Sequence, residues 1–257
     1  MIHALRQIKG IGVHAGGEPV GSVADFLFDD REWILRYVVV DTGGWLRGRQ
    51  VLVAPAAIES IDANAKRLEF ALTKLQIESA PPVDADLPVS RKYERELSHY
   101  YGWPQYWSSR ALEATAVPPP QAVTEDAATR AAHESVEPSL RSVNEVVGYT
   151  FHACDGDVGA VDDFLVDDNS WHVRYVVVDT GTWLSGRSVL VAPGWIESID
   201  WPASRVTAQV SKQQVETSPP YDPRTPLARG DEERLHEHYD RAKYWIADRN
   251  RPAVRVE

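Results

Sequence analysis

The chain has 257 residues, enough for one large domain or two ordinary ones, and its 43% apolar and 25% charged residues are typical of a soluble globular protein. Its formal net charge of −11 argues against binding to nucleic acid or anionic lipid by charge neutralisation. The lone cysteine, Cys154, excludes an intrachain disulfide and a thiolate metal cluster. The first residues hold no apolar stretch long enough for a signal peptide or a membrane span, so we expect a cytoplasmic protein.

An internal repeat organises the chain. Shifting the sequence by 138 residues aligns its two halves without a gap, and 26 of 36 positions are identical between 20–55 and 158–193. We therefore predict two tandem domains, 1–112 and 142–257, joined by a linker over 113–141 that is rich in Ala, Pro, Thr and Glu. Because duplicated domains often imitate a homodimer, we expect the halves to form an intrachain pseudo-dimer about a pseudo-two-fold axis.

In chain order, each repeat begins with apolar stretches of period two that predict short β-strands. Glycines near positions 16 and 156 predict an opening hairpin, and the Asp-Asp pairs at 29–30 and 167–168 predict the next turn. Further strands are expected at WILRYVVVD and RQVLVAP, at their counterparts WHVRYVVVD and RSVLVAP, and at RLEFALT and RVTAQVS. Roughly five or six short strands per repeat predict a mainly β fold of two small antiparallel β-barrels.

A Pro-rich extended segment and a charged helix follow each predicted barrel. The helices are predicted at 91–101 and 230–247. In the first helix, aromatic residues that include Tyr100 and Tyr101 lie at helical spacing, and Trp103 lies just beyond. This stripe predicts either packing on a barrel or a helix that docks a partner protein. We expect each helix to dock on the opposite barrel and so to help join the halves.

The tripeptide Asp-Thr-Gly closes a strand in both repeats, at Asp41 and Asp179. Aspartic proteases present their two catalytic carboxylates in this way, about 3 Å apart and sharing one proton. Here an indole, Trp45 or Trp183, follows two residues after each glycine and would crowd the space where the two loops have to meet. We therefore interpret both aspartates as turn residues whose carboxylates accept backbone N–H groups, and we keep an aspartic hydrolase as an alternative.

Other patterns that would indicate catalysis or metal binding are weak. His14 and His152 correspond across the repeat, but each lacks a Cys or His at ligand spacing. The Asp pairs at 29–30 and 167–168 are not followed by a ladder of oxygen ligands for calcium. The sequence holds no phosphate-binding loop, dinucleotide motif or nucleophile elbow. We expect no catalytic residue, no cofactor and no metal, and hence a protein that is not an enzyme.

The pattern Trp-Leu-x-Gly-Arg follows each Asp-Thr-Gly. An aromatic, an aliphatic and a guanidinium group in one loop have the composition of interface hot spots. In one interpretation the Trp covers the end of the barrel and the Arg pairs with the nearby aspartate; in the other, the loop contacts the second repeat or another protein. The candidate interaction residues are Trp45, Leu46, Arg49, Trp183, Leu184, Arg187, Tyr100, Tyr101 and Trp103.

The run V-G-x-V-x-D-F-L-x-D-D-x-x-W-x-x-R-Y-V-V-V-D-T-G-x-W-L-x-G-R-x-V-L-V-A-P resembles the PRC-barrel family, named after the cytoplasmic domain of the photosynthetic reaction centre H subunit. The likeness occurs twice, over about 10–82 and 148–220. It implies a compact β-barrel used for docking or assembly, with no catalytic residues to carry over. The membrane helix of the H subunit and the extra N-terminal domain of the ribosome-maturation branch are not found in this sequence, which is similar to stand-alone bacterial members.

The expected function is therefore a non-enzymatic protein-interaction and assembly module. We expect an adaptor for a membrane-bound complex, either reaction-centre-like or another envelope assembly, working in the cytoplasm or peripherally at the inner face of the membrane. The expected partners are proteins, with no direct nucleic-acid binding and no membrane span. A ribosome-maturation-type accessory factor is the main alternative, and the aspartic hydrolase is the other.

Overall fold

The computed structural model describes residues 1–43, 49–62, 64–81, 83, 89–107, 140–181 and 186–249. For residues 247–249 it describes the backbone alone. The described part of the chain is mainly β, with 41% strand and 26% helix. Contacts divide the chain into two compact units. Unit 1 comprises Met1–Ile8, Trp33–Leu35 and Val143–Glu257, and unit 2 comprises Lys9–Glu32 and Arg36–Ser142.

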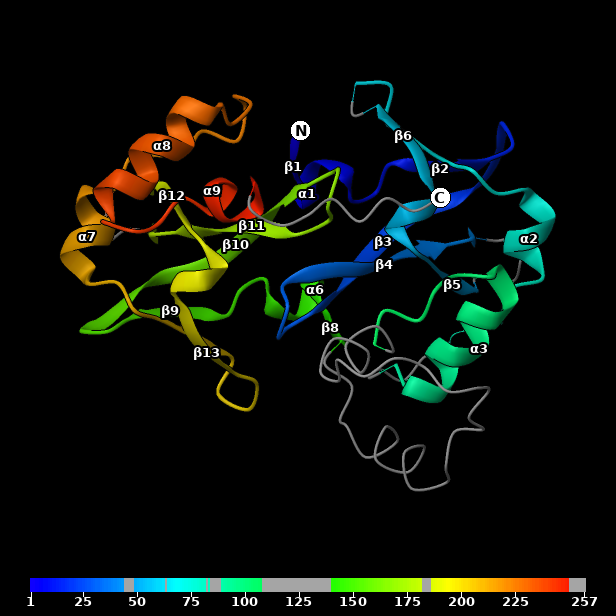
Figure 1. Ribbon diagram of the computed structural model, residues 1–257, viewed down its shortest axis with the longest axis horizontal. Coiled ribbons are helices and arrows are strands. Elements are labelled where there is room, and N and C mark those ends of the chain that lie inside the picture. Colours follow the sequence, from blue (N-terminus) through cyan, green and yellow to red (C-terminus); the bar gives the residue numbers. More distant parts are fainter. Residues whose placement is uncertain are drawn as a thin grey trace, which may run out of the picture. The chain divides into compact units, whose positions relative to one another are not determined.

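Unit 2 is built on a seven-stranded sheet with the order β5-β4-β3-β2-β7-β6, to which β8 adds beside β3 (Figure 1). The register is antiparallel for β2–β3, β3–β8, β4–β5 and β6–β7, and parallel for β2–β7. The strands are β2 (Gly12–Ala15), β3 (Glu18–Asp29), β4 (Ile34–Asp41), β5 (Gln50–Val53), β6 (Ile58–Asp62), β7 (Arg67–Phe70) and β8 (Leu140–Ser142).

Unit 1 repeats this sheet, with the order β12-β11-β10-β9-β14-β13 and β1 beside β10. Here β9 and β14 form the parallel pair. The strands are β1 (Ile2–Ala4), β9 (Thr150–Ala153), β10 (Gly156–Asp167), β11 (Val173–Asp179), β12 (Ser188–Val191), β13 (Ile196–Asp200) and β14 (Arg205–Ala208). The prediction of a mainly β fold is confirmed, with one sheet in each unit. The parallel pairs β2–β7 and β9–β14 differ from the antiparallel arrangement that we expected throughout.

Short helices lie before, between and after the strands of each sheet. Unit 2 has α2 (Lys74–Glu78), α3 (Arg91–Tyr101) and the 3₁₀ turn η2 (Pro55–Ala57). Unit 1 has α1 (Leu5–Ile8), α6 (Val143–Val146), η4 (Pro193–Trp195), α7 (Lys212–Thr217), α8 (Arg229–His238) and α9 (Tyr244–Arg249). Among the described residues, none of the helices is both long and apolar enough to cross a membrane.

The helix predicted at 91–101 is confirmed at both ends. The Ser90 hydroxyl accepts the Tyr93 N–H at 3.2 Å, and Gly102 ends the helix with a φ of 71°. The single helix predicted at 230–247 is wrong, because α8 ends at His238 and α9 begins only at Tyr244. Between them Asp240 has a φ of 51°, which a continuous right-handed helix does not allow.

Each longer helix packs on strands of its own repeat, so the expectation of docking on the opposite barrel is wrong. In unit 2, Leu97 of α3 is fully buried in a cluster with Tyr37 of β4 and Leu52 of β5. In unit 1, the Tyr175 hydroxyl of β11 donates to Glu232 of α8 at 3.1 Å. The sheet nearest in sequence already offers the apolar surface that these helices need to bury.

Candidate functional site

The Asp-Thr-Gly corner is a turn in both units. The Asp41 carboxylate accepts the Gly43 N–H at 2.8 Å, and the Asp179 carboxylate accepts the Gly181 N–H at the same distance. Gly43 and Gly181 have φ values of 60° and 54°, in the left-handed region that glycine adopts without strain. Both carboxylates are thus engaged in holding the backbone that follows them.

The threonine of this corner is buried and joins two segments. The Thr42 hydroxyl donates to the Arg49 carbonyl at 2.6 Å, and the Thr180 hydroxyl donates to the Arg187 carbonyl at 2.8 Å. Both threonines are 1% exposed. The corner therefore closes the loop that carries Trp-Leu-x-Gly-Arg.

A glycine on the neighbouring strand lets this corner approach closely. A Cβ on Gly21 would lie 2.1 Å from the carbonyl oxygen of Asp41, and one on Gly159 would lie 2.0 Å from that of Asp179. No real Cβ comes so near to a backbone oxygen, so any other residue would displace the corner. Packing thus accounts for the repetition of Val-Gly and Asp-Thr-Gly in both halves.

The arginines of the two loops bind the ends of short helices. The Arg187 guanidinium donates to the carbonyls of Glu216 and Ser218 at 3.2 and 2.6 Å, at the end of α7. The Arg49 guanidinium lies 3.4 Å from the Glu78 carbonyl, at the end of α2. Cationic side chains satisfy the free carbonyls at helix C-termini in this way. Within the described residues, these carbonyls take the place of the aspartate partner considered from the sequence.

Of the other candidate interaction residues, Trp45, Leu46, Trp183 and Leu184 lie outside the described residues. The remaining three are close together at the end of α3. The Tyr101 and Trp103 rings stack with centroids 4.1 Å apart, and the Tyr100 ring meets Tyr101 edge-on at 4.7 Å. Tyr101 and Trp103 pack against the core cluster of unit 2, whereas Tyr100 is 37% exposed.

A buried carboxylate network in unit 2 was missed from the sequence. Glu94 of α3 is fully buried and accepts the Tyr106 hydroxyl at 2.7 Å and the Tyr37 hydroxyl at 3.4 Å. The Arg91 guanidinium lies 3.1 Å from the other Glu94 oxygen, and the Arg36 guanidinium lies 3.8 Å from the centre of the Tyr106 ring. Burial raises the pKa of the Glu94 carboxyl, and it also raises the pKa of Tyr37.

Unit 1 has the same network at equivalent positions. Glu232 is 2% exposed and accepts the hydroxyls of Tyr244 at 2.6 Å and Tyr175 at 3.1 Å. The Arg229 guanidinium lies 2.9 Å from the second Glu232 oxygen. His236 adds a contact of 3.2 Å to the Tyr175 hydroxyl, and burial lowers the pKa of this imidazole. The signal was visible in the sequence as Arg-x-x-Glu followed by Tyr-Trp in each repeat.

These two networks fasten the C-terminal helices to their sheets. Each carboxylate is surrounded by hydroxyl and guanidinium donors from both the helix and a central strand, and neither carboxylate reaches the surface. A buried carboxylate that is hydrogen-bonded to hydroxyl groups and paired with a guanidinium is a structural feature that favours one packing arrangement. We therefore assign the networks to the fold.

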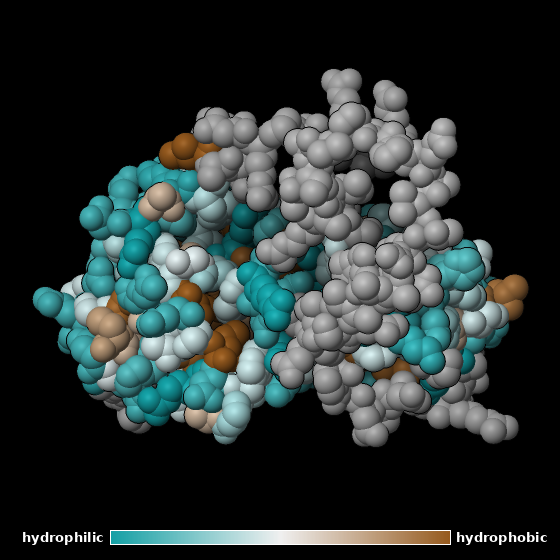
Figure 2. Space-filling view, turned by 60° about the horizontal axis from the view of Figure 1, so that its bottom comes forward, coloured by the Kyte–Doolittle hydropathy of each residue, from teal (hydrophilic) through white to brown (hydrophobic). Residues whose placement is uncertain are grey.

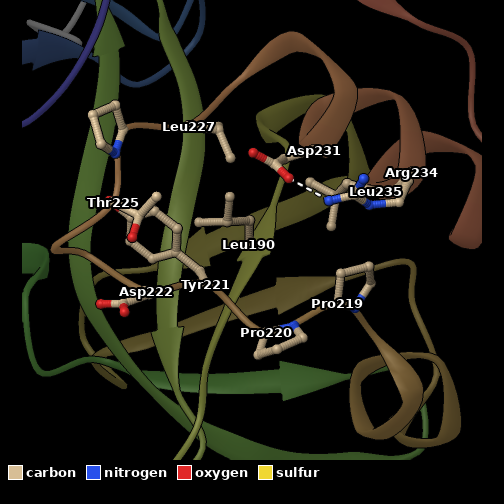
Figure 3. Close-up of a pocket in the computed structure, with 11 residues that line it drawn as sticks. Leu190, Pro219, Pro220, Tyr221, Asp222, Thr225, Leu227, Asp231, Arg234 and Leu235 are labelled. Carbon is tan, nitrogen blue, oxygen red and sulfur yellow. Dashed lines mark hydrogen bonds and ion pairs between the residues drawn. The ribbon is translucent and has the colours of Figure 1, made fainter.

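A cavity of about 350 Å³ opens in unit 1 between the Pro-rich segment and α8 (Figure 3). In the close-up, the Tyr221 ring lies beside Leu190, and Asp231 and Arg234 form an ion pair at one side. Burial raises the pKa of Tyr221 to about 12, so its hydroxyl stays neutral. The lining is Leu190, Pro219, Pro220, Tyr221, Asp222, Thr225, Pro226, Leu227, Asp231, Arg234 and Leu235. An apolar side chain of a bound peptide can fit in such a space.

The described surface offers little else that is chemically distinctive. On the face in Figure 2, hydrophobic residues lie in small separate groups among hydrophilic ones. The exposed large hydrophobic side chains of the described residues are Met1, Leu75, Tyr100, Val147 and Ile246. Across the described part of the chain, no group of three or more His, Cys, Asp or Glu side chains could hold a metal ion.

Comparison with known protein families identifies a domain in the first part of the chain. A family model described as the PRC-barrel domain matches residues 4–77, which begin at the last residue of β1 and include α1 and the strands β2 to β7. No curated protein matches the chain. The sheet of unit 1 repeats the strand order of the matched domain and suggests a second barrel-like repeat. The chain thus contains a PRC-barrel domain, which the family model places at residues 4–77.

Proposed function

We propose that this protein is a non-enzymatic assembly module that acts as an adaptor for a membrane-bound protein complex, at the cytoplasmic face of the membrane. The observation that carries the proposal is that Asp41 and Asp179 are structural residues of their turns. Each carboxylate binds a glycine N–H within its own turn, so the repeated motif that has a catalytic counterpart serves to support the fold. The PRC-barrel domain supports a non-catalytic module in general.

The proposed contact surface is the pair of loops that follow Asp-Thr-Gly, together with the end of α3. Arg49 and Arg187 tie each loop to a helix end, and the stacked Tyr101 and Trp103 give the end of α3 a rigid aromatic surface. Aromatic residues and arginine carry most of the binding energy in protein interfaces. The proposed anchors are Trp45, Leu46, Trp183 and Leu184, with Arg49, Arg187, Tyr100, Tyr101 and Trp103 beside them.

Affinity capture from the membrane fraction of the native cell tests this proposal. The tagged chain is compared with its Trp45→Ala/Trp183→Ala variant, which removes both indoles. We expect the unaltered chain to recover an integral membrane protein that the variant loses, because truncating a hot-spot Trp costs about 2 kcal/mol or more of binding free energy. The Tm of the variant is measured alongside, so that loss of binding is separated from loss of fold.

Leu75→Ala is the matched control, because Leu75 is 68% exposed and lies on α2, outside the proposed surface. This variant should recover the membrane protein as the unaltered chain does. Equal recovery by all three chains would contradict the proposed surface. Sedimentation with ribosomal particles in place of membranes would contradict the proposed class of partner.

A further inference from the structure

Each sheet contains a strand that precedes the other repeat in the chain. β1 precedes the first repeat and pairs with β10 of unit 1, whereas β8 precedes the second repeat and pairs with β3 of unit 2. Residues 2–4 and 140–142 correspond under the shift of 138 residues. In Figure 1 the blue β1 and α1 lie beside the light green β10, and the green β8 lies beside the blue β3. The repeats have therefore exchanged equivalent strands.

We call the part of each unit that binds the exchanged segment the acceptor site. In unit 1, side chains of this site bind the segment in addition to the backbone pairing of β1 with β10. Asp163 binds the Arg6 N–H through both carboxylate oxygens, at 3.0 and 3.3 Å, and so caps the first turn of α1. Asp168 lies 2.9 Å from the His3 imidazole. Leu5 and Ile8 of the segment are each 1% exposed. The acceptor site of unit 1 thus binds a side chain of β1, the first turn of α1 and two apolar side chains of the segment.

The acceptor in unit 2 uses carboxylates at the equivalent positions. The Arg141 guanidinium donates to Asp30 at 3.2 Å, and the Ser142 hydroxyl donates to Asp25. Leu140 is 3% exposed. Asp25 and Asp30 correspond to Asp163 and Asp168 in unit 1. From the sequence, Asp30 and Asp168 were predicted only to form turns.

These contacts limit which segments can bind at the acceptor site of unit 1. A strand without a helix start behind it would remove the Arg6 N–H and leave the buried Asp163 carboxylate with the Phe164 N–H, and the loss of a donor to a buried carboxylate is costly. A segment with smaller apolar residues would leave cavities at the positions of Leu5 and Ile8. The described contacts therefore fit another copy of the same segment.

We propose that the exchange also takes place between copies of the chain, so that the N-terminal segment of one copy completes the sheet of unit 1 in another. The hydrogen bonds and buried contacts are the same whether the segment comes from the same chain or from a second copy. Only the local concentration of the segment differs, as in other domain-swapped proteins. For sites joined by a short flexible connection, that concentration is about a millimolar. This inference is independent of the proposed membrane partner.

Two single-cysteine chains test the proposal, both in a Cys154→Ala background. One carries Ala4→Cys and the other Leu165→Cys, at positions that are opposite each other in the β1–β10 pair. The two chains are unfolded under reducing conditions, mixed, refolded at about 0.5 mM or about 1 µM and then oxidised. A disulfide between the different chains can form only where the segment of one copy lies on β10 of the other.

We expect a cross-linked species of twice the chain mass after refolding at the higher concentration, and at least tenfold less at the lower one. A chain with both cysteines should cross-link internally at about 1 µM. Leu190→Cys replaces Leu165→Cys as the matched buried control and should give no such species, because Leu190 lies on β12, away from β1. The proposal is overturned if the two chains stay separate at the higher concentration, if the control cross-links equally well, or if the internal cross-link fails to form.

Discussion

Asp163 accepts the main-chain N–H of Arg6 at 3.0 Å, although 157 positions separate the two residues in the sequence. The same carboxylate also accepts the Phe164 N–H at 2.8 Å. Asp163 is 6% exposed, and this burial raises the pKa of its carboxyl to about 6. The fold therefore favours the protonated form. The stabilising effect of protonation is complete below about pH 4 and is lost as the pH rises through 6.

Replacing Asp163 by asparagine should remove this pH dependence, because the amide oxygen still accepts the Arg6 N–H but cannot ionise. The quantity to measure, by urea unfolding, is the free energy of unfolding of Asp163→Asn minus that of the unaltered chain. We expect this difference to be about 2 kcal/mol larger at pH 7 than at pH 4. Arg6, Asp162 and Tyr221 are the charged or titratable groups that influence the carboxyl, and they are retained. Asp162→Asn is the matched control. A relative stability of Asp163→Asn that is the same at both pH values would contradict the account.

The buried carboxylates of α3 and α8 should be essential for stability. Glu94→Ala leaves the Tyr37 and Tyr106 hydroxyls and the Arg91 guanidinium without their shared acceptor, so we expect a loss of about 3 kcal/mol in the free energy of unfolding. Glu96→Ala, an exposed position on the same helix, should change it by less than about 0.5 kcal/mol. Equal effects of the two substitutions in denaturant unfolding would argue against the network.

The glycines that face the Asp-Thr-Gly corners should not tolerate a side chain. Gly21→Ala and Gly159→Ala would each place a Cβ about 2 Å from a backbone oxygen, so we expect each to destabilise its unit by about 3 kcal/mol or more. Gly194→Ala is the control, because its Cβ would meet nothing within 4 Å. Thermal unfolding of the three variants checks this, and a Tm for Gly21→Ala equal to that of Gly194→Ala would refute the close approach.

Changes at Asp41 and Asp179 should affect stability and no reaction. Asp41→Asn retains an oxygen that can accept the Gly43 N–H and should cost less than about 1 kcal/mol, whereas Asp41→Ala should cost about 1 kcal/mol or more. The equivalent pair at Asp179 should behave alike, because the Gly181 N–H is bound in the same way. An acid-dependent peptidase activity in the unaltered chain, lost in both Asn variants without a change in Tm, would restore the hydrolase alternative.

The sequence predicted those parts of the fold that depend on local pattern. The limits of α3 follow from Ser90 and Gly102, a capping residue and a left-handed glycine that flank the helix directly. The two related sheets follow from the repeat itself. The break between α8 and α9 was missed because it depends on the left-handed conformation of Asp240, a residue type that helices also accept.

The exchanged strands could not have been predicted in this way. β1 and β8 stand in the same place relative to their own repeats, and their sequences look alike whether they pair with the near or the far sheet. The choice is made by contacts such as Arg6 with Asp163, which join distant parts of the sequence. The two carboxylate networks, in contrast, repeat at matching positions and were open to a closer comparison of the halves.

Cleavage of the connection between the repeats tests most directly whether the exchanged strands join them into one module. A specific protease site is inserted near residue 125, and the folded chain is cut and then analysed by size-exclusion chromatography without denaturant. The uncut insertion chain is one control. A cut chain with both Ala4→Asp and Leu140→Asp, which place charges at buried positions of β1 and β8, is the other. The cut pieces should elute together at the volume of the uncut chain and should separate in the variant with both substitutions. Two smaller peaks from the cut chain without these substitutions would contradict the account.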